Sequence, residues 1–357
     1  MTHMKKITTI ILIFFCGYIS ATQNMNLFIA VNYTTDQMIM EYQKICNCTL
    51  NQTFFNDPNE MIAKIAAGSS GYDVIEATSY AVEDLAHMNK LQKLDKSKIK
   101  GLDNISPRFL SPAYDRGNEY SIPYAYTPVF LAFNVNKMKE LNIVPNTWAV
   151  IFEPKYLQKL KGHVTVLASS RNVFAAALLY LHKNPNTNNI EDLNKARTLI
   201  DNAAKYWIKF DSDSYSRGLV RGDIWVSMSY SIDIFKAIQD VKLNNLPIQI
   251  DGMLQKEGNM YEMDNLVIPK DAVHTKLAYD FINVALNPKI AYNLAITTGS
   301  SIPNRYALQM LDKSLLSNKW IYPNDAKKNF TFTAYDAKTR FLVNEMWTEI
   351  QMQCHDN

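Results

Sequence analysis

Short apolar runs alternate with amphipathic stretches along most of the chain. Leu27–Val31 is a continuous apolar run of strand length, and apolar residues then recur at helical spacing over residues 38–45. Asn56-Asp57-Pro58 supplies a capping side chain and a proline, which together begin the next helix, and Tyr72–Ile75 is a further short strand. This alternation predicts a mostly parallel sheet flanked by helices, an α/β fold.

The same alternation continues to the carboxyl end of the chain. Predicted strands are Val129–Phe133, Val164–Leu167, Ile224–Met228 and Leu266–Pro269, and predicted helices are Arg171–Leu181, residues 232–238, Lys276–Leu286, Lys289–Ile296 and Asp336–Ile350. No internal repeat or linker run separates two autonomous domains. The pattern therefore favours two α/β lobes that are joined by strands crossing from one to the other.

The amino-terminal segment has the layout of a secretory signal peptide. Lys5 and Lys6 precede the apolar run Ile7–Ile19, and the small residues Ser20 and Ala21 follow it. The run is shorter than the roughly 20 residues that a membrane span needs. We expect cleavage after Ala21 and a mature protein exported to the periplasm, with an uncleaved anchor or a buried helix as the alternative.

Cysteine and histidine usage predicts neither a disulfide framework nor a metal site. Removal of Cys16 with the signal peptide leaves Cys46, Cys48 and Cys354, an odd number. Cys46 and Cys48 are too close in sequence for an unstrained bridge to each other, although one of them reaches Cys354 if the chain ends meet. Free thiols or an incidental pair are expected. The 6 histidines are scattered without the spacing of zinc ligands.

Charge and motifs exclude several classes of function. Lys and Arg number 37 against 34 Asp and Glu, which is too even for a nucleic-acid binder with its basic face. A mean hydropathy of −0.18 excludes a polytopic membrane protein. The chain has no nucleophile elbow, no His-Glu-x-x-His and no glycine-rich phosphate loop. We therefore expect a protein without catalytic activity or cofactor, and keep an exported hydrolase with a spatially assembled triad as an alternative.

Six groups of residues occur in the order found in one known family. They are Gly71–Ile75 with Ala77–Tyr80, Leu94–Ile99, Tyr120–Tyr124, Asn146–Trp148 with Glu153–Tyr156, Met263–Pro269, and Ile302–Asn304. Together they resemble bacterial periplasmic spermidine/putrescine-binding proteins, the receptors of polyamine ABC transporters. The resemblance implies a two-lobed periplasmic-binding-protein fold, similar to type II, with a hinged cleft between the lobes. We expect lobe 1 at residues 22–130 and 261–310, and lobe 2 at 131–260 and 311–357.

The resemblance also implies a ligand site in that cleft. A polyamine carries ammonium groups along an apolar chain, and burial of each charge requires a carboxylate partner, with aromatic faces along the methylenes. Asp264 matches the aspartate of the family that binds an ammonium, and Trp225 matches an aromatic wall residue. Tyr33 matches an aromatic residue of the first strand-to-helix loop, and Ser79 or Tyr80 matches the loop after the second strand.

The chain departs from the family pattern at the other end of the cleft. Ser169 and Asn172 stand where the family has an acidic pair, and Thr333 lies near its late glutamine. Glu262 replaces the tryptophan two residues before the matching aspartate. Two interpretations follow: Glu262 compensates and a polyamine is held in a shifted pose, or the ligand is a monocation or another small polar solute.

The prediction from sequence is a monomeric receptor that delivers a polyamine or related cationic amine to a membrane permease and its ATPase. Alternatives are a receptor for thiamine, ferric ion or an anion on the same fold, and a sensor that signals through a membrane partner. Tyr230 stands alone where a ferric site needs adjacent tyrosines, and the acids Glu262 and Asp264 argue against an anion.

Overall fold

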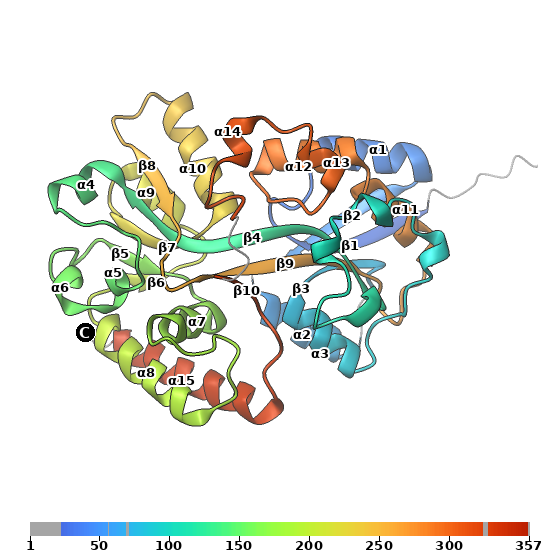
Figure 1. Ribbon diagram of the computed structural model, residues 1–357. Coiled ribbons are helices and arrows are strands. Elements are labelled where there is room, and N and C mark those ends of the chain that lie inside the picture. The colour runs from blue at the N-terminus through green and yellow to red at the C-terminus, as the bar shows by residue number, and fades with distance from the viewer. Residues whose placement is uncertain (1–22, 56, 69–70, 324–327, 356–357) are drawn as a thin grey trace, which may run out of the picture.

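The computed structural model describes residues 23–55, 57–68, 71–323 and 328–355. The predicted signal peptide and Asn56 lie outside these ranges. A mixed sheet of 10 strands runs through the molecule, and helices cover both of its faces (Figure 1). The predicted α/β class is therefore confirmed.

Parallel strands form the first half of the sheet, in the order β2-β1-β3. Side chains fix where the helices between them begin, since Thr35 and Asp57 accept hydrogen bonds from the first-turn amides of Met38 and Asn59. The elements are β1 (Asn24–Ala30), α1 (Asp36–Cys46), β2 (Thr49–Phe55), α2 (Pro58–Ala66), β3 (Val74–Thr78) and α3 (Ser79–His87).

Two long antiparallel strands, β4 (Ser121–Asn134) and β9 (Asn259–Val267), join the halves of the sheet (Figure 1). Four short 3₁₀ helices, Lys96–Lys98, Leu102–Asn104, Pro107–Phe109 and Arg116–Asn118, precede β4. β9 pairs with β3 on one side, and β4 pairs with β7 (Val226–Tyr230) on the other. β8 (Ile250–Met253) and β10 (Asn329–Thr331) add to β4 and β9. All 14 residues of β4 are buried, which makes it the central strand of the core.

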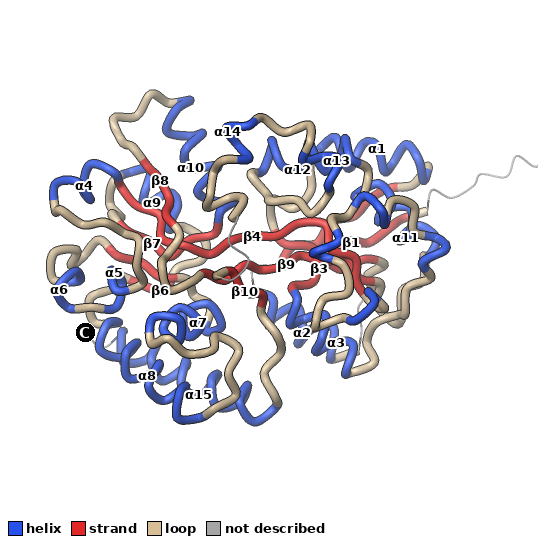
Figure 2. Tube along the Cα trace, viewed as in Figure 1, coloured by secondary structure: helices blue, strands red, loops and turns tan. Residues whose placement is uncertain are grey.

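The second half of the sheet is again parallel, in the order β7-β5-β6. Its elements are α4 (Val135–Glu140), α5 (Ala149–Phe152), α6 (Pro154–Leu157), β5 (Val164–Val166), α7 (Ser170–Tyr180), α8 (Ile190–Ala204), β6 (Lys209–Phe210), α9 (Tyr215–Arg221) and α10 (Ser231–Leu243). The chain then adds α11 (Thr275–Ala285) and α12 (Pro288–Thr298), which pack on α1, followed by α13 (Arg305–Leu308) and α14 (Lys313–Leu316). It ends in α15 (Ala337–His355), which packs on α7 and α8 (Figure 2).

β2, α8 and α9 are among the elements that sequence periodicity missed. β2 is an edge strand, paired only with β1, and it exposes Thr49, Asn51 and Thr53 instead of presenting an apolar run. Among the described helices, none is long and apolar enough to cross a membrane.

The expectation that Cys46 and Cys48 are too close to pair is wrong. A disulfide joins them, with their Cα atoms 5.1 Å apart. Asn47, at the end of α1, adopts the left-handed conformation (φ 49°, ψ 46°) and reverses the chain, which brings the flanking side chains together. The bridge also excludes pairing of either cysteine with Cys354.

Candidate ligand-binding site

A cavity of about 700 Å³ opens between the two halves of the sheet. Its floor is one face of β3, β4 and β9, one rim is the loop after β1, and the opposite wall comes from α9 and α10. Lining residues are Ala30, Val31, Asn32, Tyr33, Phe55, Pro58, Glu76, Thr78, Thr127, Ser212, Asp213, Ser216, Arg217, Val220, Arg221, Tyr230, Ile232, Asp233, Lys236, Ala237, Asp240, Glu262 and Asp264.

Strand alternation gathers three carboxylates on the cavity floor. Glu262 and Asp264 are two residues apart on β9 and therefore point to the same face. Thr78 of β3 lies opposite Asp264, so Glu76, two residues earlier, shares this face as well. Thr127 of β4 lies opposite Glu262 and completes the floor. Three neighbouring strands thus present acidic and hydroxyl groups to one point.

These carboxylates are buried without a cation. Glu76 and Asp264 are each 1% exposed and Glu262 is 8% exposed. None of the ion pairs formed within the described part of the chain includes any of the three. A buried charge without a partner is strongly unfavourable, so the floor is a site where a positive charge is stabilised.

Hydroxyl and amide groups hold the two carboxylates nearest the first rim. Asp264 Oδ2 accepts a hydrogen bond of 3.2 Å from Thr127 Oγ1, and Tyr33 OH lies 2.7 Å from the same Thr127 oxygen. Glu76 Oε2 accepts a hydrogen bond of 3.2 Å from the backbone amide of Ala30. The loop after β1 is therefore connected directly to the acidic floor.

Burial and mutual repulsion favour the protonated forms of these acids. Burial raises the pKa of Glu76 to about 8, against the hydrogen bond from Ala30 and with a further contribution from the charge of Glu262. Burial, followed by the charges of Glu76 and Glu262, raises the pKa of Asp264 well above its usual range. Without a cation, the floor therefore retains protons near neutral pH.

Glu262 belongs to a second polar cluster, formed with α7 and β7. Glu262 Oε1 accepts hydrogen bonds from Asn172 Nδ2 at 2.8 Å and from Tyr230 OH at 3.3 Å. Asn172 Nδ2 also lies 3.1 Å from Ser169 Oγ, the capping oxygen of α7. Because a carboxylate only accepts, the amide of Asn172 must present its nitrogen to Glu262. Burial still raises the pKa of Glu262, although both donors oppose the increase.

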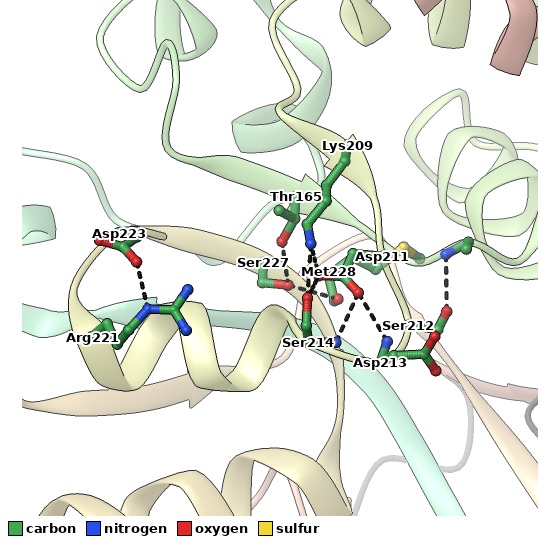
Figure 3. A network of polar contacts seen from close by, with 11 residues as sticks. Thr165, Lys209, Asp211, Ser212, Asp213, Ser214, Arg221, Asp223, Ser227 and Met228 are labelled. Carbon is green, nitrogen blue, oxygen red and sulfur yellow. Dashed lines mark hydrogen bonds and ion pairs between the residues drawn. The ribbon is translucent and has the colours of Figure 1, made fainter. Parts of the chain in front are cut away.

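A hydrogen-bonded loop forms part of the opposite wall. Asp211 accepts hydrogen bonds from the backbone amides of Asp213 (2.9 Å) and Ser214 (2.8 Å) and pairs with Lys209 Nζ at 2.8 Å (Figure 3). This network fixes the turn that brings Ser212 and Asp213 to the cavity. Exposed side chains of both signs surround the mouth: Asp213, Arg217, Arg221, Lys236 and Asp240. The acidic character therefore lies deep in the cavity, below a mixed rim.

The structure brings several of the sequence-predicted residues together. Tyr33, Glu262 and Asp264 line the cavity, and Asn172 and Ser169 support Glu262 from behind. Ser79, Tyr80 and Thr333 do not line it. Ser79 Oγ donates to the Phe332 carbonyl at 2.6 Å, Tyr80 packs edge-on against the Phe332 ring, and the Thr333 carbonyl accepts from Arg171 at 2.9 Å. These three residues connect α3, α7 and the segment after β10.

The placement of Trp225 in the cavity wall is wrong. Its ring stacks on His163, with 3.6 Å between the ring centroids, and Lys137 Nζ lies 4.8 Å from the centroid of the Trp225 ring. Trp225 precedes β7 by one residue, whereas Tyr230, five residues on, lines the cavity. At about 3.3 Å per strand residue, roughly 16 Å separate them. Tyr230 is thus the aromatic residue that this strand contributes.

Glu76 is the carboxylate of the cavity floor that sequence reasoning missed. It stands in β3 between Ile75 and Ala77, and all five residues of that strand are buried. The available signal was a carboxylate inside an otherwise apolar strand, because acids in such positions are rarely buried unless they have a partner. No group of three His, Cys, Asp or Glu side chains among the residues described is placed to hold a metal ion.

Comparisons with known proteins agree with this architecture. A family model described as bacterial extracellular solute-binding protein matches residues 37–331. A putrescine/cadaverine-binding protein of Pseudomonas aeruginosa is 34% identical over 336 residues, which cover 94% of this chain and 95% of the relative. The putrescine-binding periplasmic protein PotF of Escherichia coli is 26% identical over 329 residues, which cover 90% of this chain and 89% of PotF.

Solved structures carry the same fold. A putative spermidine/putrescine ABC transporter structure from Listeria monocytogenes superimposes with a TM-score of 0.84 at 23% identity, covering 93% of this chain and 100% of that one. The lipoprotein Tp0655 of Treponema pallidum gives a TM-score of 0.80 at 25% identity and covers 92% of this chain and 100% of its own. The predicted periplasmic-binding-protein fold is therefore confirmed.

Proposed function

The chain belongs to the family of bacterial extracellular solute-binding proteins, and from this premise we propose that it is the receptor of an ABC transporter for a polyamine or a related cationic amine. The receptor works as a monomer in the periplasm after cleavage behind Ala21, and delivers its ligand to a membrane permease driven by an ATPase. This assignment is supported by the relatives, which are named as binding proteins for putrescine, cadaverine or spermidine.

The observation that carries the proposal is the group of three buried carboxylates without a cation. Glu76, Glu262 and Asp264 share one face of the sheet, and each is at most 8% exposed. An ammonium group offers a positive charge and three hydrogen-bond donors. It therefore supplies both the charge and the donors that these carboxylates need. A neutral or anionic solute would bring no positive charge to stabilise the ionised forms of these buried acids.

Asp264 is the primary anchor in this proposal. Its carboxylate is oriented by Thr127, which is in turn held by Tyr33. Tyr33 also presents an aromatic face, and Phe55 and Ile232 add apolar surface on the two sides of the cavity. An ammonium therefore binds at the floor, and the methylene chain lies against apolar side chains.

We place the hinge where the chain passes between the halves of the sheet. Lobe 1 comprises residues 22–130 and 261–310, lobe 2 comprises 131–260 and 311–357, and β4 and β9 cross between them. An ion pair of 2.7 Å between Asp84 of α3 and Arg340 of α15 connects the two proposed lobes. Closure of the lobes around the amine would exclude water from the acidic floor and strengthen the ammonium contacts.

A panel of small solutes tests the proposal. Thermal unfolding of the mature protein should shift upward with putrescine, cadaverine or spermidine, because a ligand that binds only the folded state stabilises it. Acetate and phosphate should cause no shift. Asp264→Asn should weaken amine binding in isothermal titration by about 30-fold or more, as expected for loss of a buried charge partner worth about 2–5 kcal/mol.

Trp225→Phe provides the matched control, since Trp225 stacks on His163 outside the cavity and its replacement should leave amine affinity unchanged. Equal affinities of the wild type and Asp264→Asn, with both proteins folded, would remove the proposed anchor. A shift produced by an anion instead of an amine would contradict the assigned ligand class.

A further inference from the structure

We propose that Glu262 selects a short diamine by binding its second ammonium, so that the ligand lies along β9 with one charge at Asp264 and the other at Glu262. The inference rests on the proposed amine binding at Asp264. It adds the residue that senses the length of the ligand and the direction in which the ligand lies.

The spacing of the two carboxylates supports this pose. Glu262 and Asp264 are alternate residues on one face of β9, so their Cα atoms are about 6.6 Å apart. A fully extended chain with carbon bonds of about 1.5 Å advances about 1.25 Å per bond. The nitrogens of a diamine with four methylenes are five bonds apart, or about 6 Å, and one more methylene gives about 7.5 Å on the same estimate. The spacing of Glu262 and Asp264 on the cavity face of β9 therefore matches the spacing of the two nitrogens in a diamine of four or five methylenes.

Glu262 is held in place for this role. One of its oxygens, Oε1, accepts from Asn172 and Tyr230, while Oε2 has no hydrogen-bond partner within the ranges that the structure describes. The amide oxygen of Asn172 is likewise buried without a partner there, and Asn172 is 0% exposed. The cluster thus fixes the position of one carboxylate and leaves acceptors unused. An ammonium in the cavity would donate to the unused Oε2 of Glu262, because Glu262 lines the cavity.

Asp233 is the competing partner for the second ammonium. It lines the same cavity from α10, on the opposite wall, and a diamine reaching it would span the cleft instead of following β9. Asp233 Oδ2 already accepts a hydrogen bond of 2.6 Å from Tyr215 OH. Burial raises the pKa of Asp233, while this hydrogen bond and the charge of Lys236, three residues on, oppose the increase. Glu262 has no such cation, so the second ammonium gains more at Glu262.

The test removes the contact between Glu262 and the second ammonium in two ways, by a change in the ligand and by a change in the protein. Putrescine (1,4-diaminobutane) and 1-aminobutane differ in the second ammonium, and Glu262→Gln removes its partner with little change in shape. Isothermal titration of both amines into the wild type should show a preference for the diamine of about 30-fold or more. In Glu262→Gln the preference should fall to about threefold or less, because the affinity for 1-aminobutane hardly changes.

Two further variants make this result specific. Glu345→Gln carries the same chemical change on an exposed position of α15 and should keep the full preference. Asp233→Asn should keep it as well. A preference that survives in Glu262→Gln, or that disappears in Asp233→Asn, would overturn the proposed pose.

A length series gives a second readout that needs only the wild-type protein. Affinity for unbranched diamines should be greatest at about four or five methylenes and should fall by tenfold or more at eight, where the two charges no longer fit adjacent positions on one strand. Affinity that rises steadily with length would overturn the inference while leaving amine binding at Asp264 intact. Failure of the wild type to bind any amine would overturn the proposed function as well.

Discussion

Replacing Glu76 with glutamine should remove much of the pH dependence of the stability of the ligand-free protein. Glu76 is 1% exposed, and within the described part of the chain its carboxylate accepts a hydrogen bond from the Ala30 amide, from which a glutamine carbonyl can also accept. The substitution therefore keeps the shape and the hydrogen bond, and deletes the group that loses a proton. It also relieves the repulsion that Glu76 exerts on Asp264.

The sign of the effect follows from the folded and unfolded pKa values. Glu76 has a pKa of about 8 in the folded protein, against 4.5 ordinarily, so between these values the folded state holds a proton that the unfolded state has lost. The resulting stabilisation is fully present below pH 4.5 and is lost as the pH rises through about 8. Each tenfold difference in proton affinity corresponds to about 1.4 kcal/mol, which sets an upper limit of about 5 kcal/mol. Asp264 and Glu262 titrate in the same cluster and share this effect. We therefore expect the unfolding free energy to fall by about 2–5 kcal/mol as the cluster loses its protons.

Denaturant unfolding at pH 5, 6, 7 and 8 measures this quantity, with the mature protein stripped of ligand. The wild type should lose about 2–5 kcal/mol of unfolding free energy over that range, and Glu76→Gln should lose less than half as much. At pH 8 the variant should be the more stable protein. Glu60→Gln, an exposed position on α2, is the control and should follow the wild type. Parallel curves for Glu76→Gln and the wild type would refute the reasoning.

Two further predictions concern ligand binding and the connection between the lobes. Amine binding should release about one proton near pH 7, because the ligand's charge replaces protons retained by the floor. The affinity for the amine should therefore rise from pH 6 to pH 8. Calorimetric titration in buffers with different heats of ionisation measures the number of protons released. Arg340→Leu should lower the unfolding free energy by about 1–2 kcal/mol, because it leaves Asp84 buried without its cation while Arg340 is itself partly exposed.

Each of these has a clear contrary result. Affinity that is flat or falls between pH 6 and pH 8 would contradict proton retention by the acidic floor. For the interlobe pair, the double variant Asp84→Asn with Arg340→Leu should recover part of the lost stability, since no uncompensated charge remains. A double variant that is destabilised by the full sum of the single effects would show that the two side chains do not interact.

The strands and helices with strong apolar periodicity could be predicted from sequence. The largely apolar segments Leu27–Val31, Val164–Leu167 and Ile224–Met228 overlap β1, β5 and β7, which lie in the parallel halves of the sheet, where strands are buried on both faces. The edge strand β2 lacks that signature because one of its sides faces solvent. The bridge between Cys46 and Cys48 depends on a left-handed turn at Asn47, which residue spacing does not reveal.

The site was harder to predict because it depends on register. Asp264 and Glu262 could be found from their matching segment, but the partner of Glu262 is Asn172, which is 90 residues away in sequence. Trp225 was misplaced because a resemblance along β7 does not specify which residue reaches the carboxyl end of the strand. Glu76 joins the site only through the pairing of β3 with β9, a long-range contact that periodicity does not contain.

A crystal structure of the mature protein with putrescine tests the central claim most directly. The account predicts one ligand nitrogen within about 3 Å of an Asp264 carboxylate oxygen and the other at the same distance from Glu262, with the methylenes running along β9. A ligand that binds elsewhere in the cleft and leaves the floor carboxylates without an ammonium would contradict it.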